Sequence, residues 1–157
     1  RARKDITCVM HTHSRAGLAI ACLKEGLIPM IQDAAFLYNR VSYHDWEGMS
    51  TNTEECERLS ENLGSNKVMI LRNHGLMTVG NTVAAAFQRM YRLERACQVQ
   101  IDAGRAGTLN VMSDNLAAKS GYETNAFCEI EEGYGFGELE FAALMRKIDK
   151  IDASYAV

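Results

Sequence analysis

The alternation of apolar and polar positions changes its period along the chain, and each period predicts one kind of element. Residues 6–13, ITCVMHTH, are rich in apolar and β-branched side chains, as expected for a buried strand. Residues 15–25, RAGLAIACLKE, predict a helix that Ser14 caps and Gly26 ends. Residues 26–48 follow no single period, so we expect short strands and loops around a small helical piece there.

A short helix is predicted over residues 51–64, TNTEECERLSENLG. Thr51 and Glu54 have the spacing of a capping box, and Gly64 supplies the stop. The acidic side chains of this segment are most simply a solvent-exposed helix face, made of Glu54, Glu55, Glu57 and Glu61.

Two strands joined by a tight turn are predicted over residues 67–80, KVMILRNHGLMTVG, with the turn at residues 73–75. The longest helix is predicted over residues 81–107, where Gly104 and Gly107 break the pattern. Its apolar residues recur at helical spacing, at Val83, Phe87, Met90, Leu93, Cys97 and Ile101.

The pattern fades between residues 108 and 137, where glycine and polar residues dominate. A last amphipathic helix is predicted over residues 138–152, and its apolar side carries Phe141, Leu144, Met145, Ile148 and Ile151. Strand, helix, mixed segment, helix, hairpin and long helix therefore follow one another. This order predicts an α/β layered domain.

The composition is typical of a globular protein with a sizeable core: 157 residues, 47% hydrophobic and 24% charged, with a net charge of −3. No charge run resembles a nucleic-acid footprint, and no apolar run reaches the length needed for membrane insertion. The chain starts RARKDITCVM, with neither an initiator Met nor a signal-peptide pattern. We therefore expect an upstream part of the domain to be absent from residues 1–157.

The cysteines are odd in number and scattered, and none forms a C-x-x-C pair. This usage predicts reduced, mostly buried thiols in a cytosol-like compartment, and hence a cytoplasmic protein. The spacing also argues against a cysteine zinc site. The five are Cys8, Cys22, Cys56, Cys97 and Cys128.

Three of the four histidines stand at the ends of predicted strands. His11 and His13 point to the same face of their strand, roughly 6 to 7 Å apart at a rise of about 3.3 Å per residue. His74 lies in the turn after a second apolar strand, and the following Gly75 permits a tight backbone. If the two strands share a sheet, three imidazoles converge with an open position, as in a catalytic zinc site. The alternatives are an incidental His-x-His pair and an ordinary hairpin turn.

The other candidates carry weaker signals. His44, in VSYHDWEG, stands among predicted loop residues, where a surface or loop-packing role is expected. Trp46, Tyr43 and Tyr38 cluster in the same region, which indicates local packing, a subunit contact or a substrate wall. The glycines of LRNHGLMTVGN do not form the Gly-x-Gly-x-x-Gly pattern of a dinucleotide site.

Five segments, in order from about residue 6 to residue 155, together resemble the class II aldolase/adducin family. They are VMHTHSRAGLAIACLKEGLIPM, VSYHDWEG, ILRNHGLMTVG, AFQRMYRLERACQVQ and FAALMRKIDKIDASY. The resemblance implies a three-layer α/β/α fold around a mostly antiparallel sheet. It also implies a divalent metal, usually zinc, held by three histidines whose positions match His11, His13 and His74. In the aldolases this metal acts as a Lewis acid on a small sugar phosphate and stabilises the enediolate of aldol cleavage.

The resemblance carries further expectations about partners and missing parts. Members form rings, often tetramers, so a homo-oligomer is expected with residues 28–48 at the subunit interface. Tyr43 lies near the loop that supplies a catalytic tyrosine to a neighbouring subunit in some members. The phosphate loops and the acidic base of the enzymes precede the His-x-His strand, which here has few residues before it. The alternative is a non-catalytic, adducin-like head domain that binds actin and spectrin partners.

Overall fold

A four-stranded mixed sheet forms the middle layer of the structure, a computed structural model that describes residues 3–48, 53–128 and 134–156. Its strand order is β1-β4-β3-β2. The two central strands pair antiparallel, as do β1 and β4, whereas β2 runs parallel to β3. The predicted mostly antiparallel sheet is therefore confirmed. The strands are β1 (Cys8–Thr12), β2 (Val41–His44), β3 (Val68–Leu71) and β4 (Gly75–Gly80).

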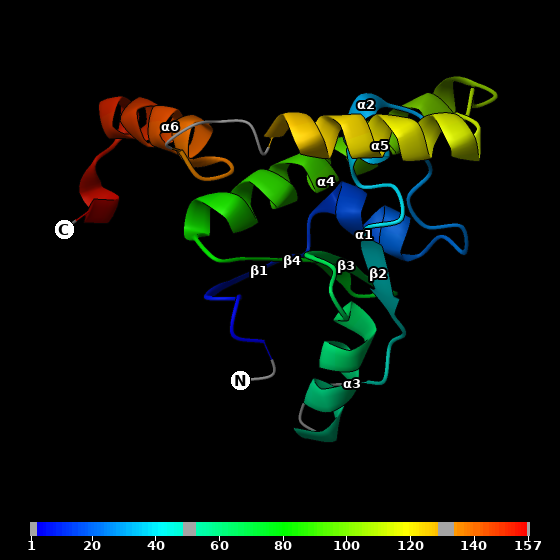
Figure 1. Ribbon diagram of the computed structural model, residues 1–157, viewed down its shortest axis with the longest axis horizontal. Helices are drawn as coiled ribbons and strands as arrows, with labels where there is room; N and C mark the ends of the chain where they lie inside the picture. The colour runs from blue at the N-terminus through cyan, green and yellow to red at the C-terminus, as the bar shows by residue number, and fades with distance from the viewer. Residues whose placement is uncertain (1–2, 49–52, 129–133, 157) are drawn as a thin grey trace.

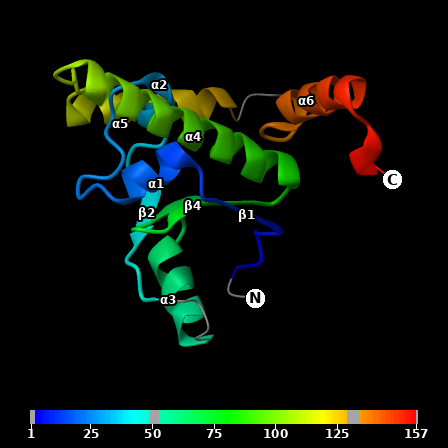
Figure 2. The same ribbon diagram turned by 180° about the vertical axis from the view of Figure 1, so that it is seen from behind.

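Helices cover both faces of this sheet, which confirms the α/β/α layering. Figures 1 and 2 show α3 alone on one side, with α1 and α4 on the other and α5 beyond them. The last helix, α6, lies near the N-terminal end of α4 in both views. The helices are α1 (Arg15–Ala21), α2 (Gln32–Phe36), α3 (Thr53–Leu63), α4 (Val83–Ala106), α5 (Asp114–Cys128), α6 (Glu138–Ile151) and a short 3-10 turn (Ser154–Ala156).

The central strand β3 explains why both faces must be covered. All four of its residues are buried, and successive side chains point to opposite faces. Val68 and Ile70 join the apolar cluster beneath α1 and α4, while Met69 and Leu71 join the cluster against α3. A strand that is apolar on both faces can avoid water only inside such a sandwich.

Most predicted helix boundaries agree with the structure, with two exceptions. Ser14 caps α1 as expected, with its hydroxyl accepting the N–H of Gly17 at 3.2 Å, but the helix ends at Ala21 instead of residue 25. The predicted break at Gly104 is wrong, because α4 continues through it to Ala106. Thr51 of the predicted capping box lies outside the described residues.

Helix α5 lies in the segment where the sequence pattern fades. Ala117 is its fully buried apolar contact, and the helix packs chiefly on α2. A side chain at Gly121 would meet the Ala35 carbonyl oxygen at 2.7 Å. The glycine that makes this segment look loop-like therefore permits close helix–helix contact.

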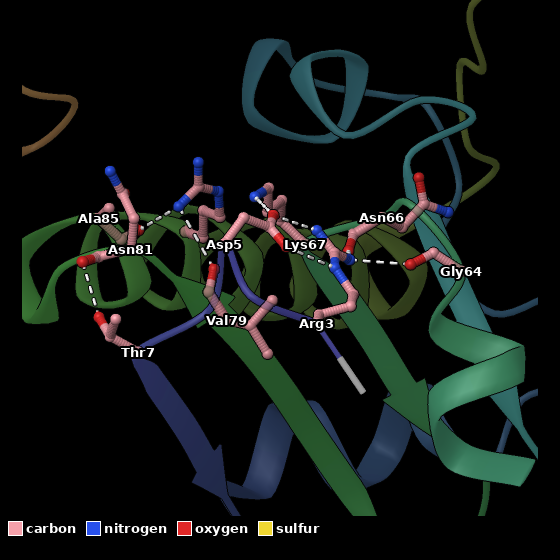
Figure 3. A network of polar contacts seen from close by, with 10 residues as sticks. Arg3, Asp5, Thr7, Gly64, Asn66, Lys67, Val79, Asn81 and Ala85 are labelled. Atoms are coloured by element: carbon pink, nitrogen blue, oxygen red, sulfur yellow. Dashed lines mark hydrogen bonds and ion pairs between the residues drawn. The ribbon is translucent and has the colours of Figure 1, made fainter. Parts of the chain in front are cut away.

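A polar network ties the N-terminal segment to the residues just before β3 (Figure 3). The guanidinium of Arg3 donates to the carbonyl oxygens of Gly64 and Asn66 at 2.8 and 2.6 Å. The Asp5 carboxylate accepts from Arg3 at 2.6 Å and from Lys67 at 2.5 Å. These two cations hold the pKa of Asp5 well below its usual range.

The cysteines only partly follow the prediction. Four of the five, Cys8, Cys22, Cys56 and Cys97, are free thiols. Cys97 is buried, and burial raises the pKa of its thiol to about 12. The expectation of mostly buried thiols is wrong for Cys22 and Cys56, which are exposed. Among the described residues, no helix combines the length and apolar character needed to cross a membrane.

Truncating a core side chain on β4 should strongly destabilise the fold. Leu76 is fully buried, and Leu76→Ala should lower the free energy of unfolding by about 2–5 kcal/mol through lost burial and the cavity left behind. Leu116 on α5 is 52% exposed, so Leu116→Ala should change it by less than about 0.5 kcal/mol. Urea denaturation followed by circular dichroism measures both values, and equal losses would contradict this packing.

Candidate metal centre

The pairing of β1 with β4 brings the histidines together from distant parts of the sequence. Thr12 of β1 stands opposite Leu76 of β4 in the antiparallel register. His11 and His13 therefore reach the end of the sheet where the turn between β3 and β4 carries His74. The condition set by the sequence, that the two strands share one sheet, is met through β4.

The turn that carries His74 is held at both sides. The N–H of His74 donates to the Leu71 carbonyl at 3.0 Å, which closes a four-residue turn. Asn73 adopts the left-handed conformation with a φ of 59°, which asparagine tolerates better than most residues. Its N–H donates to the Ala21 carbonyl at the end of α1 at 3.0 Å. The backbone beneath His74 is thus attached to both the sheet and a helix.

The three imidazole rings face one another at close range. The ring centroids of His11 and His13 are 4.6 Å apart, and each lies 4.8 to 4.9 Å from that of His74. One ring nitrogen from each histidine can be chosen so that all three lie within 4.8 Å of one another. Three nitrogen ligands at this separation can bind one divalent cation, with a further position left for another ligand.

Hydrogen bonding orients the His11 ring. Its Nδ1 lies 2.8 Å from the Leu76 carbonyl oxygen, so Nδ1 carries the proton and donates. Its Nε2 then carries a lone pair, which accepts the Nε2–H of His13 at 2.8 Å. A carbonyl that fixes the tautomer of a histidine is the usual support of a metal-binding imidazole. The donor set therefore fits a metal such as zinc.

Burial and the neighbouring rings favour the neutral form of His74. Partial burial lowers the pKa of His74, and the charges that His11 and His13 can carry lower it further. The Trp46 indole packs edge-on against the His74 ring at 5.0 Å between centroids. Of the roles expected for Trp46, the structure thus shows local packing, against a histidine of the cluster.

Close approach of the backbone at Gly75 keeps the site compact. A Cβ at this position would meet the Thr12 carbonyl oxygen at 2.5 Å. It would also meet ring carbons of His13 and His11 at 3.0 and 3.2 Å. Only glycine therefore lets the turn come this close to the histidine pair.

Tyr43 does not join the histidine cluster in this structure. Its ring belongs to the apolar cluster on the α1 side of the sheet, and its hydroxyl accepts the N–H of Leu27 at 3.1 Å. Burial raises the pKa of Tyr43, while the Arg72 guanidinium stacks on its ring at 4.6 Å from the centroid.

Two residues that the sequence assigned to the surface are buried beside the cluster. His44 is the last residue of β2 and only 5% exposed, so the expected loop or surface placement is wrong. Glu55 on α3 is 7% exposed, so it does not belong to a solvent-exposed acidic face. A signal existed, because Glu55 precedes Leu59 and Leu63 at helical spacing on the side that faces the sheet.

Adding a methyl group at Gly75 should disturb the site and the fold. The contacts above predict that Gly75→Ala lowers the free energy of unfolding by about 1–3 kcal/mol and weakens zinc binding. Gly104→Ala is the matched control, because no atom lies within 4 Å of its added Cβ and alanine favours the helix by about 0.5–1 kcal/mol. Denaturation and zinc titration of both variants test this, and unchanged zinc binding in folded Gly75→Ala would refute it.

Comparison with known proteins shows which family the chain matches. The family model described as Class II Aldolase and Adducin N-terminal domain matches residues 1–101. A provisionally named class 2 aldolase protein of Pseudomonas aeruginosa is 39% identical over 155 residues, which cover 98% of this chain and 59% of that protein. Alpha-adducin of Rattus norvegicus is 36% identical over 159 residues, which cover 96% of this chain and 22% of that protein.

Solved structures agree with these matches. An aldolase II superfamily protein from Pseudomonas syringae has a TM-score of 0.88 and 39% identity, over 98% of this chain and 61% of that one. An L-fuculose 1-phosphate aldolase from Glaciozyma antarctica has a TM-score of 0.66 and 32% identity, over 78% of this chain and 46% of that one. The chain thus spans about 60% of the length of its bacterial relatives. By sequence and by fold, the chain belongs to the class II aldolase and adducin family.

Proposed function

We propose that His11, His13 and His74 bind one zinc ion, and that the chain is the metal-binding part of an aldolase acting on a small sugar phosphate. The observation that carries this proposal is the convergence of the three rings, with one nitrogen of each within 4.8 Å of the others. In the zinc-bound protein, these nitrogens are expected about 2.0 to 2.3 Å from the ion. When bound, zinc would act as a Lewis acid on the oxygen atoms of a hydroxy-carbonyl substrate.

The chain's own residues prepare the site for this chemistry. The Leu76 carbonyl holds the His11 ring with a lone pair facing His13. The Trp46 indole covers one side of His74 and is 46% exposed, so it can also line the approach of a substrate. Fixed ligands and a partly apolar wall strengthen electrostatic interactions with an oxygen atom that gains negative charge.

One relative supports the choice of substrate class. The Glaciozyma antarctica relative is named as an L-fuculose 1-phosphate aldolase, which makes a phosphorylated sugar the first substrate class to test. We further propose a homo-oligomer with residues 28–48 at the subunit boundary. In that arrangement Tyr43 is a candidate acid or base only if its hydroxyl leaves Leu27, since the two are hydrogen-bonded here.

A non-catalytic role is the second candidate. Its support is the 36% identity to alpha-adducin over 96% of this chain, close to the 39% over 98% for the class 2 aldolase protein of Pseudomonas aeruginosa. Under this reading the fold is kept as an interaction domain with actin or spectrin partners. Shared fold alone does not decide between catalysis and binding.

Removing one histidine should abolish metal binding without unfolding the chain. His74→Ala deletes one of three ligands, so the chain should change from about one bound zinc to almost none. The thermal midpoint of the metal-free variant should stay close to wild type, because the ring is partly exposed. Elemental analysis after dialysis and differential scanning calorimetry give the two values. A variant that retains full zinc would place the metal elsewhere.

The 157-residue chain is expected to bind zinc but to cleave ketose phosphates slowly or not at all. Aldol chemistry also needs a positioned acid or base and a grip on the phosphate. The resemblance assigns both to a part of the longer relatives that precedes the His-x-His strand. The test compares this chain with a longer form that also contains the part preceding the His-x-His strand in the relatives. Both are assayed on a panel of ketose phosphates, and their zinc content is measured in parallel. Full activity in this chain would show that the acid or base lies within it.

A further inference from the structure

A small cavity lies between the histidine cluster and helix α3. Its volume is about 30 Å³, and it is lined by His74 and Trp46 from the site and by His44 and Glu55 from β2 and α3. A single water needs at least about 10–15 Å³ and two to four polar partners. The cavity is therefore large enough for one water, and His44, Glu55 and His74 are polar residues in a lining that also contains Leu59 and Leu71.

His44 carries an unsatisfied nitrogen at this cavity. Its Nδ1 pairs with the Asn62 side-chain oxygen at 2.9 Å, and its Nε2 is buried without a hydrogen-bond partner among the described residues. The nearest Glu55 oxygen is 3.7 Å from Nε2, too far for a direct hydrogen bond. Polar contacts longer than about 3.5 Å between buried groups are commonly bridged by water.

Glu55 is the carboxylate best placed to act at this point. The carboxylate of Glu47 also lies 3.9 Å from His44 Nε2, but both of its oxygens accept from the Arg58 guanidinium at 2.5 to 3.0 Å. Asp45 is largely exposed and faces Arg72 at 3.5 Å. Glu55 is buried and lines the cavity together with His44 and His74.

His74 needs a partner on the side away from the metal. An imidazole that binds a metal through one nitrogen usually donates its other N–H to a carboxylate, a carbonyl or a water. For His11 that partner is the Leu76 carbonyl. Among the described residues no hydrogen bond to the His74 ring is seen, whereas the cavity that His74 lines is also lined by the buried carboxylate of Glu55.

We propose that Glu55 and His44 are positioning residues that hold His74 through one water bound in this cavity. The water would accept or donate at His44 Nε2, Glu55 and the second nitrogen of His74, which satisfies the buried groups together. This inference rests on the metal centre proposed above and deepens it. It gives the metal a carboxylate support that comes from α3, on the opposite face of the sheet from α1 and α4.

Cobalt(II) replaces zinc in the test, because its visible absorption reports on ligand geometry. The wild-type chain is compared with Glu55→Gln, which keeps shape and removes charge, and with His44→Phe, which keeps a ring and removes the nitrogens. Glu57→Gln is the matched control, since Glu57 is exposed on the same helix. Thermal unfolding of the metal-free forms first establishes that each variant is folded.

The expected result is a cobalt affinity about 10–100-fold lower in Glu55→Gln and His44→Phe, with shifted visible bands, and no change in Glu57→Gln. If one of the two variants does not fold, the other decides. If the folded Glu55→Gln and His44→Phe variants bind cobalt with the wild-type affinity and spectrum, the positioning role is wrong, while the metal centre itself still stands. Failure of the wild-type chain to bind cobalt or zinc would overturn the metal centre itself. A crystal structure with His44 and Glu55 in direct contact and no water would overturn the bridge.

Discussion

The antiparallel pairing of β1 with β4 is the constraint on which the candidate site depends. Residues of β1 and the β3–β4 turn are far apart in the chain, and only this register places them at one end of the sheet. The pairing can be close because Gly75 has no side chain to collide with the Thr12 carbonyl. A register slip of one residue would turn His11 and His13 to the other face and dissolve the cluster.

The two faces of the sheet each carry an apolar cluster, and they bury different polar side chains. The face toward α1 and α4 is packed with apolar side chains such as Ile20, Ile70 and Leu93. The face toward α3 also has an apolar cluster, but at the histidine end it buries His44 and Glu55. Buried polar groups are costly unless satisfied, so they are expected where they contribute to a site. Under the proposal above, His44 and Glu55 support His74 from the α3 side, whereas the Leu76 carbonyl supports His11 from within the sheet.

The family relationship sets the frame of the function without choosing its chemistry. The chain is similar to a bacterial aldolase-type protein and to alpha-adducin to comparable degrees, at 39% and 36% identity. The three converging imidazoles of this chain could hold a metal ion under either reading. A bound metal becomes a catalyst only with a positioned acid or base and a grip on the substrate, and the three histidines supply neither.

Local patterns in the sequence predicted the strands and most helices and singled out the three histidines at strand ends. They could do so because periodicity and turn preferences depend on only a few neighbouring residues. The His-x-His spacing put two imidazoles on one face, and the Asn-His-Gly turn marked the third. Tertiary structure alone decided that β4 lies between β1 and β3, that α5 packs through Gly121 on Ala35, and that His44 and Glu55 are buried together. These features arise from contacts between residues distant in the chain, and strand order or helix packing leaves no short-range period for a sequence to display.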